Sequence, residues 1–223
     1  MSWSNAASAG IQPPMDIPDS PEPVWHMLHL PRVGPEALIV ILQGADRSDM
    51  AAFVPGWHEA VPRAAFAAIL TERKSSADAA LIALIRARID EMGLTFGQVV
   101  LVGAGSAGHV ALDLVLQGRA PGAGAIVVDL PRPALPRVMR AAPASLRFVQ
   151  HRDEDDPEGR AFHEMIRVLR DLSFDIRTFA LWDGPDPTNG ALNTFLVELV
   201  AHASRYPSAA RHPTRQDDST DAA

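Results

Sequence analysis

The chain of 223 residues contains no cysteine, and Lys74 is its only lysine. Without cysteine it can form no disulfide, no thiolate metal site and no cysteine nucleophile. Its arginines are scattered, and a formal net charge of −7 provides no electrostatic footprint for nucleic acid or for an anionic membrane. The sequence therefore predicts neither nucleic acid nor a membrane surface as a partner.

Long apolar runs are also absent. The first residues do not combine a basic start with an apolar stretch, so no secretory signal is predicted, and no run reaches the length of a membrane span. We therefore expect a cytoplasmic protein with no membrane span. Residues 1–23 are polar and Pro-rich and predict a flexible leader, and residues 207–223 predict a disordered polar tail. One domain is expected between them, over residues 24–206.

Seven runs of strand length alternate with helical patterns inside that domain. The run at 37–43 is apolar throughout, which is typical of a strand buried on both faces, whereas the alternation at 24–30 indicates an antiparallel strand. This order predicts an α/β fold with a mainly parallel sheet of about seven strands flanked by helices. Strands are expected at 24–30, 37–43, 64–70, 98–104, 124–130, 146–152 and 176–182, and helices at 49–61, 75–93, 106–118, 157–172 and 189–206.

The segment VVLVGAGSAGHVALDLVL, residues 99–116, fits two kinds of site. Gly103, Gly105 and Gly108 spell G-x-G-x-x-G between a strand and a helix, which is the pattern of a dinucleotide-binding loop. Asp129 ends the next strand about 20 residues later, where an acidic residue would bind a ribose. However, about three strands precede the pattern, whereas this fingerprint normally lies on the first strand of its unit.

The order of the segments favours a second hypothesis. It rests on ALIVILQGADRSDMAAFVPGWHEAVP, then ALIALIRARIDEMGLTFGQVVLVGAGSAGHVALDLVL, then LRFVQHRDEDDP. Over about residues 24–204 the chain resembles the phospholipase/carboxylesterase family, the acyl-thioesterase-like branch of the α/β-hydrolases. The resemblance implies a single-domain α/β-hydrolase-like fold and a Ser–His–Asp esterase site. No cofactor and no metal are expected.

The elbow of that family reads G-F-S-Q-G-G. An alignment without a gap places Gly105 on the nucleophile, so the attacking hydroxyl is missing, and glycine adopts the strained elbow conformation at little cost. A register shifted by one residue instead makes Ser106 the nucleophile of a loose small-x-Ser-x-Gly elbow, residues 104–108. Ser106 also suits the start of a helix, so both roles remain open for it.

The family's triad acid has a counterpart in this sequence, whereas its base has none at the expected position. The family's acid falls on Asp155, four residues after His151. The base should follow the last strand, but residues 182–192 contain no histidine, and Asp183 or Asp186 lies there instead. A carboxylate holds no proton at neutral pH unless its pKa is strongly raised, so it makes a poor substitute.

Other histidines and the oxyanion loop complete the comparison with the family. If Ser106 is active, an unconventional base such as His109 or His163 must serve it. The His-Gly opening of the family's oxyanion loop becomes Gln43-Gly44-Ala45, and Asp46 adds a negative charge that opposes an oxyanion.

These departures favour a degenerate triad. We expect a chain that has lost hydrolytic activity and acts as a binding, regulatory or assembly subunit, through self-association or an unknown protein partner. Two alternatives remain, an active carboxylesterase or thioesterase and a dinucleotide-binding protein. The residues concerned are Gln43, Gly44, Ala45, Gly105 and Ser106 for a small anionic or acyl ligand; Gly105 and Asp186 at the degenerate nucleophile and base positions; Ser106 and Asp155 for an active esterase; and Gly103, Gly105, Gly108 and Asp129 for a dinucleotide.

Overall fold

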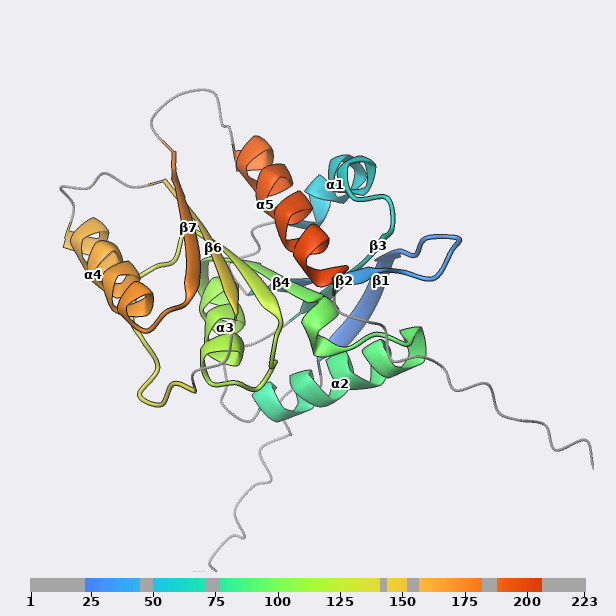
Figure 1. Ribbon diagram of the computed structural model, residues 1–223, viewed down its shortest axis with the longest axis horizontal. Coiled ribbons are helices and arrows are strands. Elements are labelled where there is room, and N and C mark those ends of the chain that lie inside the picture. The colour runs from blue at the N-terminus through green and yellow to red at the C-terminus, as the bar shows by residue number, and fades with distance from the viewer. Residues whose placement is uncertain are drawn as a thin grey trace, which may run out of the picture.

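The computed structural model describes residues 23–44, 50–70, 77–140, 144–151, 157–181 and 188–205. At its centre lies a seven-stranded sheet in the order β1-β3-β2-β4-β5-β6-β7 (Figure 1). β1 runs antiparallel to β3, and every other neighbouring pair is parallel, which confirms the predicted fold class. The strands are β1 (Val24–His29), β2 (Ala37–Gln43), β3 (Ala64–Leu70), β4 (Val99–Ala104), β5 (Gly124–Val128), β6 (Ser145–Gln150) and β7 (Asp175–Ala180).

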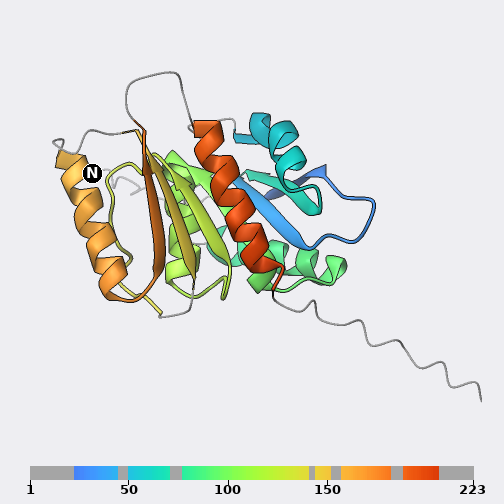
Figure 2. The same cartoon turned by 45° about the horizontal axis from the view of Figure 1, so that its top comes forward.

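Helices cover both faces of the sheet. Figure 2 shows α5 lying across one face with α1 beside it, and α2, α3 and α4 pack on the other. None of the helices within the described ranges is both long and apolar enough to cross a membrane. The helices are α1 (Val54–Ala60), α2 (Ala77–Met92), α3 (Gly105–Leu116), α4 (Pro157–Asp171) and α5 (Thr188–Ala203), with 3-10 helices at Met50–Phe53 and Phe96–Gln98.

Two apolar cores lie on the two faces of the sheet, because successive side chains of a strand point to opposite sides. In β2, Leu38 and Val40 join the core under α2, α3 and α4, whereas Ile39 and Ile41 join the core under α1 and α5. Fully burying one such side chain contributes about 1.5–3 kcal/mol. The prediction that residues 37–43 are buried on both faces is confirmed for all but the last residue, Gln43, which is partly buried.

Several elements end at other residues than the apolar pattern predicts. β5 ends at Val128 because Asp129 has φ 47, which takes the chain out of the strand. α3 begins at Gly105 rather than at residue 106, and α5 begins at Thr188. The predicted leader, apart from Pro23, and the predicted tail lie outside the described residues.

Candidate functional site

The carboxyl ends of β2, β4, β5, β6 and β7 lie at one edge of the sheet, because these strands are parallel. This is the edge at which open α/β sheets bind ligands. Leu42 of β2 pairs with Gly103 of β4, so Gln43 and Gly44 extend beside the turn into α3. Asp129 follows the end of the next strand. Four of the predicted site positions therefore lie close together.

Two glycines of the G-x-G-x-x-G pattern lie where the backbone leaves little room for a Cβ. A Cβ on Gly103 would lie 2.6 Å from the carbonyl oxygen of Ala107, because the first turn of α3 crosses directly over β4. A Cβ on Gly108 would lie 3.0 Å from Cγ1 of Val127 and 3.1 Å from the carbonyl oxygen of Gly103. The close approach of α3 to the sheet therefore accounts for both glycines without a bound nucleotide.

The third glycine carries the turn itself. Ala104 is extended, with φ −114 and ψ 152, and the chain enters α3 at Gly105 with φ 56. This positive φ is the left-handed region, which glycine adopts readily and other residues adopt at a cost. Ser106 follows as the second residue of the helix and is partly buried, while Ala104 rather than Ser106 is the N-cap.

The two histidines predicted as unconventional bases both hydrogen-bond to main-chain carbonyls. His109 is buried on α3, and its Nε2 donates to the carbonyl of Pro131. His163 lies on α4, and its Nδ1 donates to the carbonyl oxygen of Gly159 at 2.9 Å. A ring nitrogen that donates to a carbonyl carries a proton, so neither of these two nitrogens is a free base in this arrangement.

A third histidine, His151, has two polar side chains as partners at this edge. Its main-chain N–H donates to Oδ1 of Asp129 at 2.8 Å, and its ring Nδ1 is 2.7 Å from Oδ2 of the same carboxylate. Its Nε2 is 2.9 Å from Oγ1 of Thr188, the first residue of α5. Asp129, which the dinucleotide hypothesis assigns to a ribose, thus uses both carboxylate oxygens to hold His151.

Thr188 was not among the predicted site residues, and no catalytic role was predicted for His151. The available signal was positional, since His151 and Asp129 both end buried parallel strands. The predicted residues Ala45, Asp155, Asp183 and Asp186 lie outside the described residues. His151 immediately precedes the segment that contains Asp155, and Thr188 immediately follows the segment that contains Asp183 and Asp186. A hydrogen bond therefore joins the ends of the two segments to which the resemblance assigns the acid and the base.

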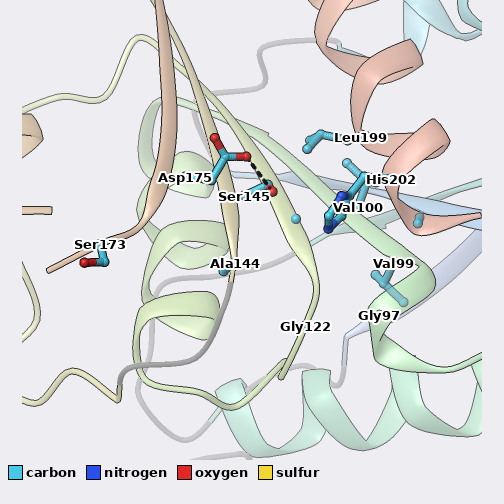
Figure 3. Close-up of a pocket in the computed structure, with 12 residues that line it drawn as sticks. Gly97, Val99, Val100, Gly122, Ala144, Ser145, Ser173, Asp175, Leu199 and His202 are labelled. Atoms are coloured by element: carbon cyan, nitrogen blue, oxygen red, sulfur yellow. Dashed lines mark hydrogen bonds between the residues drawn. The ribbon is translucent and has the colours of Figure 1, made fainter. Parts of the chain in front are cut away.

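A cavity of about 370 Å³ lies at the opposite edge, among the amino ends of β4 to β7. Figure 3 shows Ser145 and Asp175 on one side of it and Leu199 and His202 of α5 on the other. The hydroxyl of Ser145 donates to Oδ2 of Asp175 at 2.8 Å. This edge is remote from the β4–α3 turn, because it holds the other ends of the same strands.

Charged side chains near this cavity form a network of ion pairs. Arg147, 2 % exposed, contacts Oδ2 of Asp175 and Oε1 of Glu198, each at 2.9 Å. Burial would raise the pKa of Asp175, but hydrogen bonds from Arg147 and Ser145 and the charges of Arg147 and Arg177 outweigh it and lower that pKa. The network joins β6, β7 and α5, so we interpret these charges as structural.

Comparisons with known proteins identify the architecture. No protein-family model matches the chain, and no curated protein matches it significantly. The crystal structure of esterase PE8 matches with a TM-score of 0.60 and 16 % identity, over 80 % of this chain and 99 % of that one. YahD with malic acid matches with a TM-score of 0.60 and 12 % identity, over 80 % and 98 %. A phospholipase/carboxylesterase from Dyadobacter fermentans DSM 18053 matches with a TM-score of 0.56 and 12 % identity, over 80 % and 97 %. This chain therefore has the α/β-hydrolase fold that such esterases share.

Proposed function

We propose that this chain has kept the hydrolase scaffold, has lost hydrolysis through its elbow, and binds a small anionic or acyl ligand there as a binding, regulatory or assembly subunit. The observation that carries the proposal is Gly105, which takes φ 56 at the turn from β4 into α3. In α/β-hydrolases the nucleophile occupies this sharp, strained strand-to-helix turn. A glycine there keeps the turn and supplies no hydroxyl.

The packing around the turn supports the alignment without a gap. An elbow needs small residues two positions before and two positions after its nucleophile, because the backbone crosses itself there. Around Gly105 these positions are Gly103 and Ala107, and the Ala107 carbonyl lies directly over Gly103. Ser106 lies one residue further along, inside the first turn of α3.

The same turn has the features of an anion site. The first N–H groups of a helix have no acceptor within the helix, and the helix dipole adds a partial positive charge at this end. Gly44, buried at the end of β2, lies beside the turn. Carboxylate, phosphate and acyl oxygens are the acceptors that suit such donors. The YahD structure holds malic acid, which makes a carboxylate a sensible first probe.

An experiment on thermal unfolding tests the proposal. We expect malate, acetate or inorganic phosphate at millimolar concentration to raise the Tm, because a ligand of the folded state alone stabilises it. Ser106→Asp should abolish the shift by placing a carboxylate at the second residue of α3. Asn189→Asp is the matched control, since it adds the same charge at the second residue of α5 and should leave the shift intact.

Two outcomes of this experiment would contradict the proposal. The first is the absence of any shift with all three anions. The second is a shift produced by NAD alone, which would favour the dinucleotide hypothesis built on Gly103, Gly105, Gly108 and Asp129.

An active esterase that uses Ser106, with Asp155 as its acid, is the second candidate function. The structural neighbours include an esterase and a phospholipase/carboxylesterase, so the shared fold is compatible with an active esterase. It requires the elbow register shifted by one residue, with Ser106 in place of Gly105 as the residue that faces the substrate.

A further inference from the structure

The three side chains Asp129, His151 and Thr188 form a continuous hydrogen-bonded chain. They come from the end of β5, the end of β6 and the start of α5, at the carboxyl edge of the sheet. An acid, an imidazole and a hydroxyl connected in this order are the components of a nucleophilic relay. In this fold they come from positions other than the elbow.

The direction of each hydrogen bond follows from the chemistry of the groups. An ionised carboxylate only accepts, so Nδ1 of His151 must carry the proton that it shares with Asp129 at 2.7 Å. In the neutral ring the other nitrogen then has a lone pair. Nε2 therefore accepts the hydroxyl proton of Thr188 across 2.9 Å. This is the tautomer in which an imidazole acts as a general base toward a hydroxyl.

Two further features would stabilise the charges that form when a proton moves from Thr188 to His151. The carboxylate of Asp129 accepts two hydrogen bonds from one residue, which fixes the orientation of the His151 ring and stabilises the cation formed when the ring takes a proton. Thr188 is also the first residue of a 16-residue helix, so the positive end of the helix dipole lies next to its hydroxyl. A helix N-terminus favours negative charge that develops beside it.

We propose that Thr188 is the acyl-accepting nucleophile of this chain, with His151 as its general base and Asp129 as the positioning residue. This inference goes beyond the proposed function, because it places the reacting hydroxyl outside the elbow. The substrate class is an acyl ester or thioester. Thr188 is 5 % exposed, whereas the side chain of His151 is 38 % exposed, so the imidazole is the more accessible part of this chain of hydrogen bonds.

The reaction balances without a cofactor. Oγ1 of Thr188 forms a bond to the acyl carbon while Nε2 of His151 takes the hydroxyl proton. The bond from carbon to the leaving oxygen or sulfur breaks, and His151 gives its proton to that atom, which releases an alcohol or a thiol. Water then attacks the acyl-threonine, His151 takes a proton from the water and returns it to Oγ1, and the free acid leaves.

Covalent labelling of the full-length protein tests the assignment. The protein is incubated with a fluorophosphonate probe, digested with trypsin, and the adduct is located by fragment sequencing. Cleavage at arginine places Ser106 in the peptide 89–119 and Thr188 in the peptide 178–205, so the two sites are distinguished. We expect the adduct on Thr188. An adduct on Ser106 would overturn this inference and the proposed function together, whereas no adduct on folded protein would overturn this inference alone.

Variants add a kinetic readout with p-nitrophenyl acetate. Thr188→Ser should keep labelling and turnover, and Thr188→Val, of almost equal volume, should lose both by a factor on the order of 100 or more. Asp129→Asn should lower kcat by a similar factor and leave KM unchanged, because an amide donates to Nδ1 and forces the wrong tautomer. Turnover of Thr188→Val equal to that of the wild type would overturn the assignment.

Discussion

Among single residues, Gly105 determines what the elbow can do. It takes the positive φ that the turn from strand to helix requires, and it supplies no reactive group. Asp129 also has a positive φ, of 47, but its conformation is held by the two hydrogen bonds that its carboxylate accepts from His151. The chain therefore uses one left-handed residue, Gly105, in the turn from β4 into α3 and another, Asp129, to position His151.

Replacement of Gly105 by alanine tests the conformational requirement. The φ of 56 places a Cβ in the left-handed region, so Gly105→Ala should lower the free energy of unfolding by about 1–2 kcal/mol. Gly190→Ala is the matched control, because Gly190 lies in a helical turn of α5 and a Cβ there meets nothing within 4 Å. That change should raise the free energy of unfolding by up to about 1 kcal/mol.

Urea denaturation of the two variants and the wild type provides the comparison. If Gly105→Ala proved as stable as Gly190→Ala, the turn would not need glycine. Gly105 would then give no structural reason to infer that a glycine has replaced the nucleophile.

At the level of elements, β1 is an edge strand of the sheet. It pairs only with β3 among the described strands, and most of its side chains are exposed. His29 at its end stacks on His58 of α1, with ring centroids 3.7 Å apart, and lies near Phe66 of β3. Burial has the larger effect in lowering the pKa of His29, and the charge of the nearby His58 lowers it further.

This lowered pKa makes the attachment of β1 sensitive to acid. In the unfolded chain His29 titrates near its ordinary value of 6.5 and therefore binds protons more readily than in the fold. The contribution of this group to stability is complete above that pH and falls as the pH drops below it. We therefore expect the free energy of unfolding to decrease from about pH 7.5 to about pH 5.5, and His29→Gln to remove part of that decrease.

Denaturant titrations at the two pH values measure the effect. His26→Gln serves as the control, because His26 is exposed on the same strand, and it should keep the wild-type difference. A pH difference in His29→Gln equal to that of the wild type would show that the stacked pair does not titrate as argued.

The elements themselves were largely predictable from the sequence, because apolar runs of strand length and helical periodicity survive in a single chain. Their ends were less so. The apolar run 124–130 continues two residues beyond β5, because Leu130 is buried although it lies outside the strand. The strand ends before Asp129, whose φ of 47 is not a strand conformation. Hydrophobicity reports burial, whereas a strand end depends on a backbone angle.

For the chain as a whole, the sequence predicts a spatial arrangement only where its residues are close together in the chain. The turn from β4 into α3 lies within one short segment, so a strand-to-helix turn at residues 103–108 could be predicted from the sequence alone. His151 is 22 residues from Asp129 and 37 residues from Thr188, and only the order of the strands and the placement of α5 bring them together. No spacing rule within a single sequence predicts such a contact.

The central claim is that the elbow of this hydrolase fold carries no nucleophile. The most direct test is the rate of p-nitrophenyl acetate hydrolysis by the wild-type protein and by Ser106→Ala. This account predicts equal rates, within about a factor of two, because Ser106 is a helix residue beyond the turn and any hydrolysis occurs elsewhere. A loss of about 100-fold or more in a folded Ser106→Ala protein would contradict it and would identify Ser106 as the nucleophile of an active esterase.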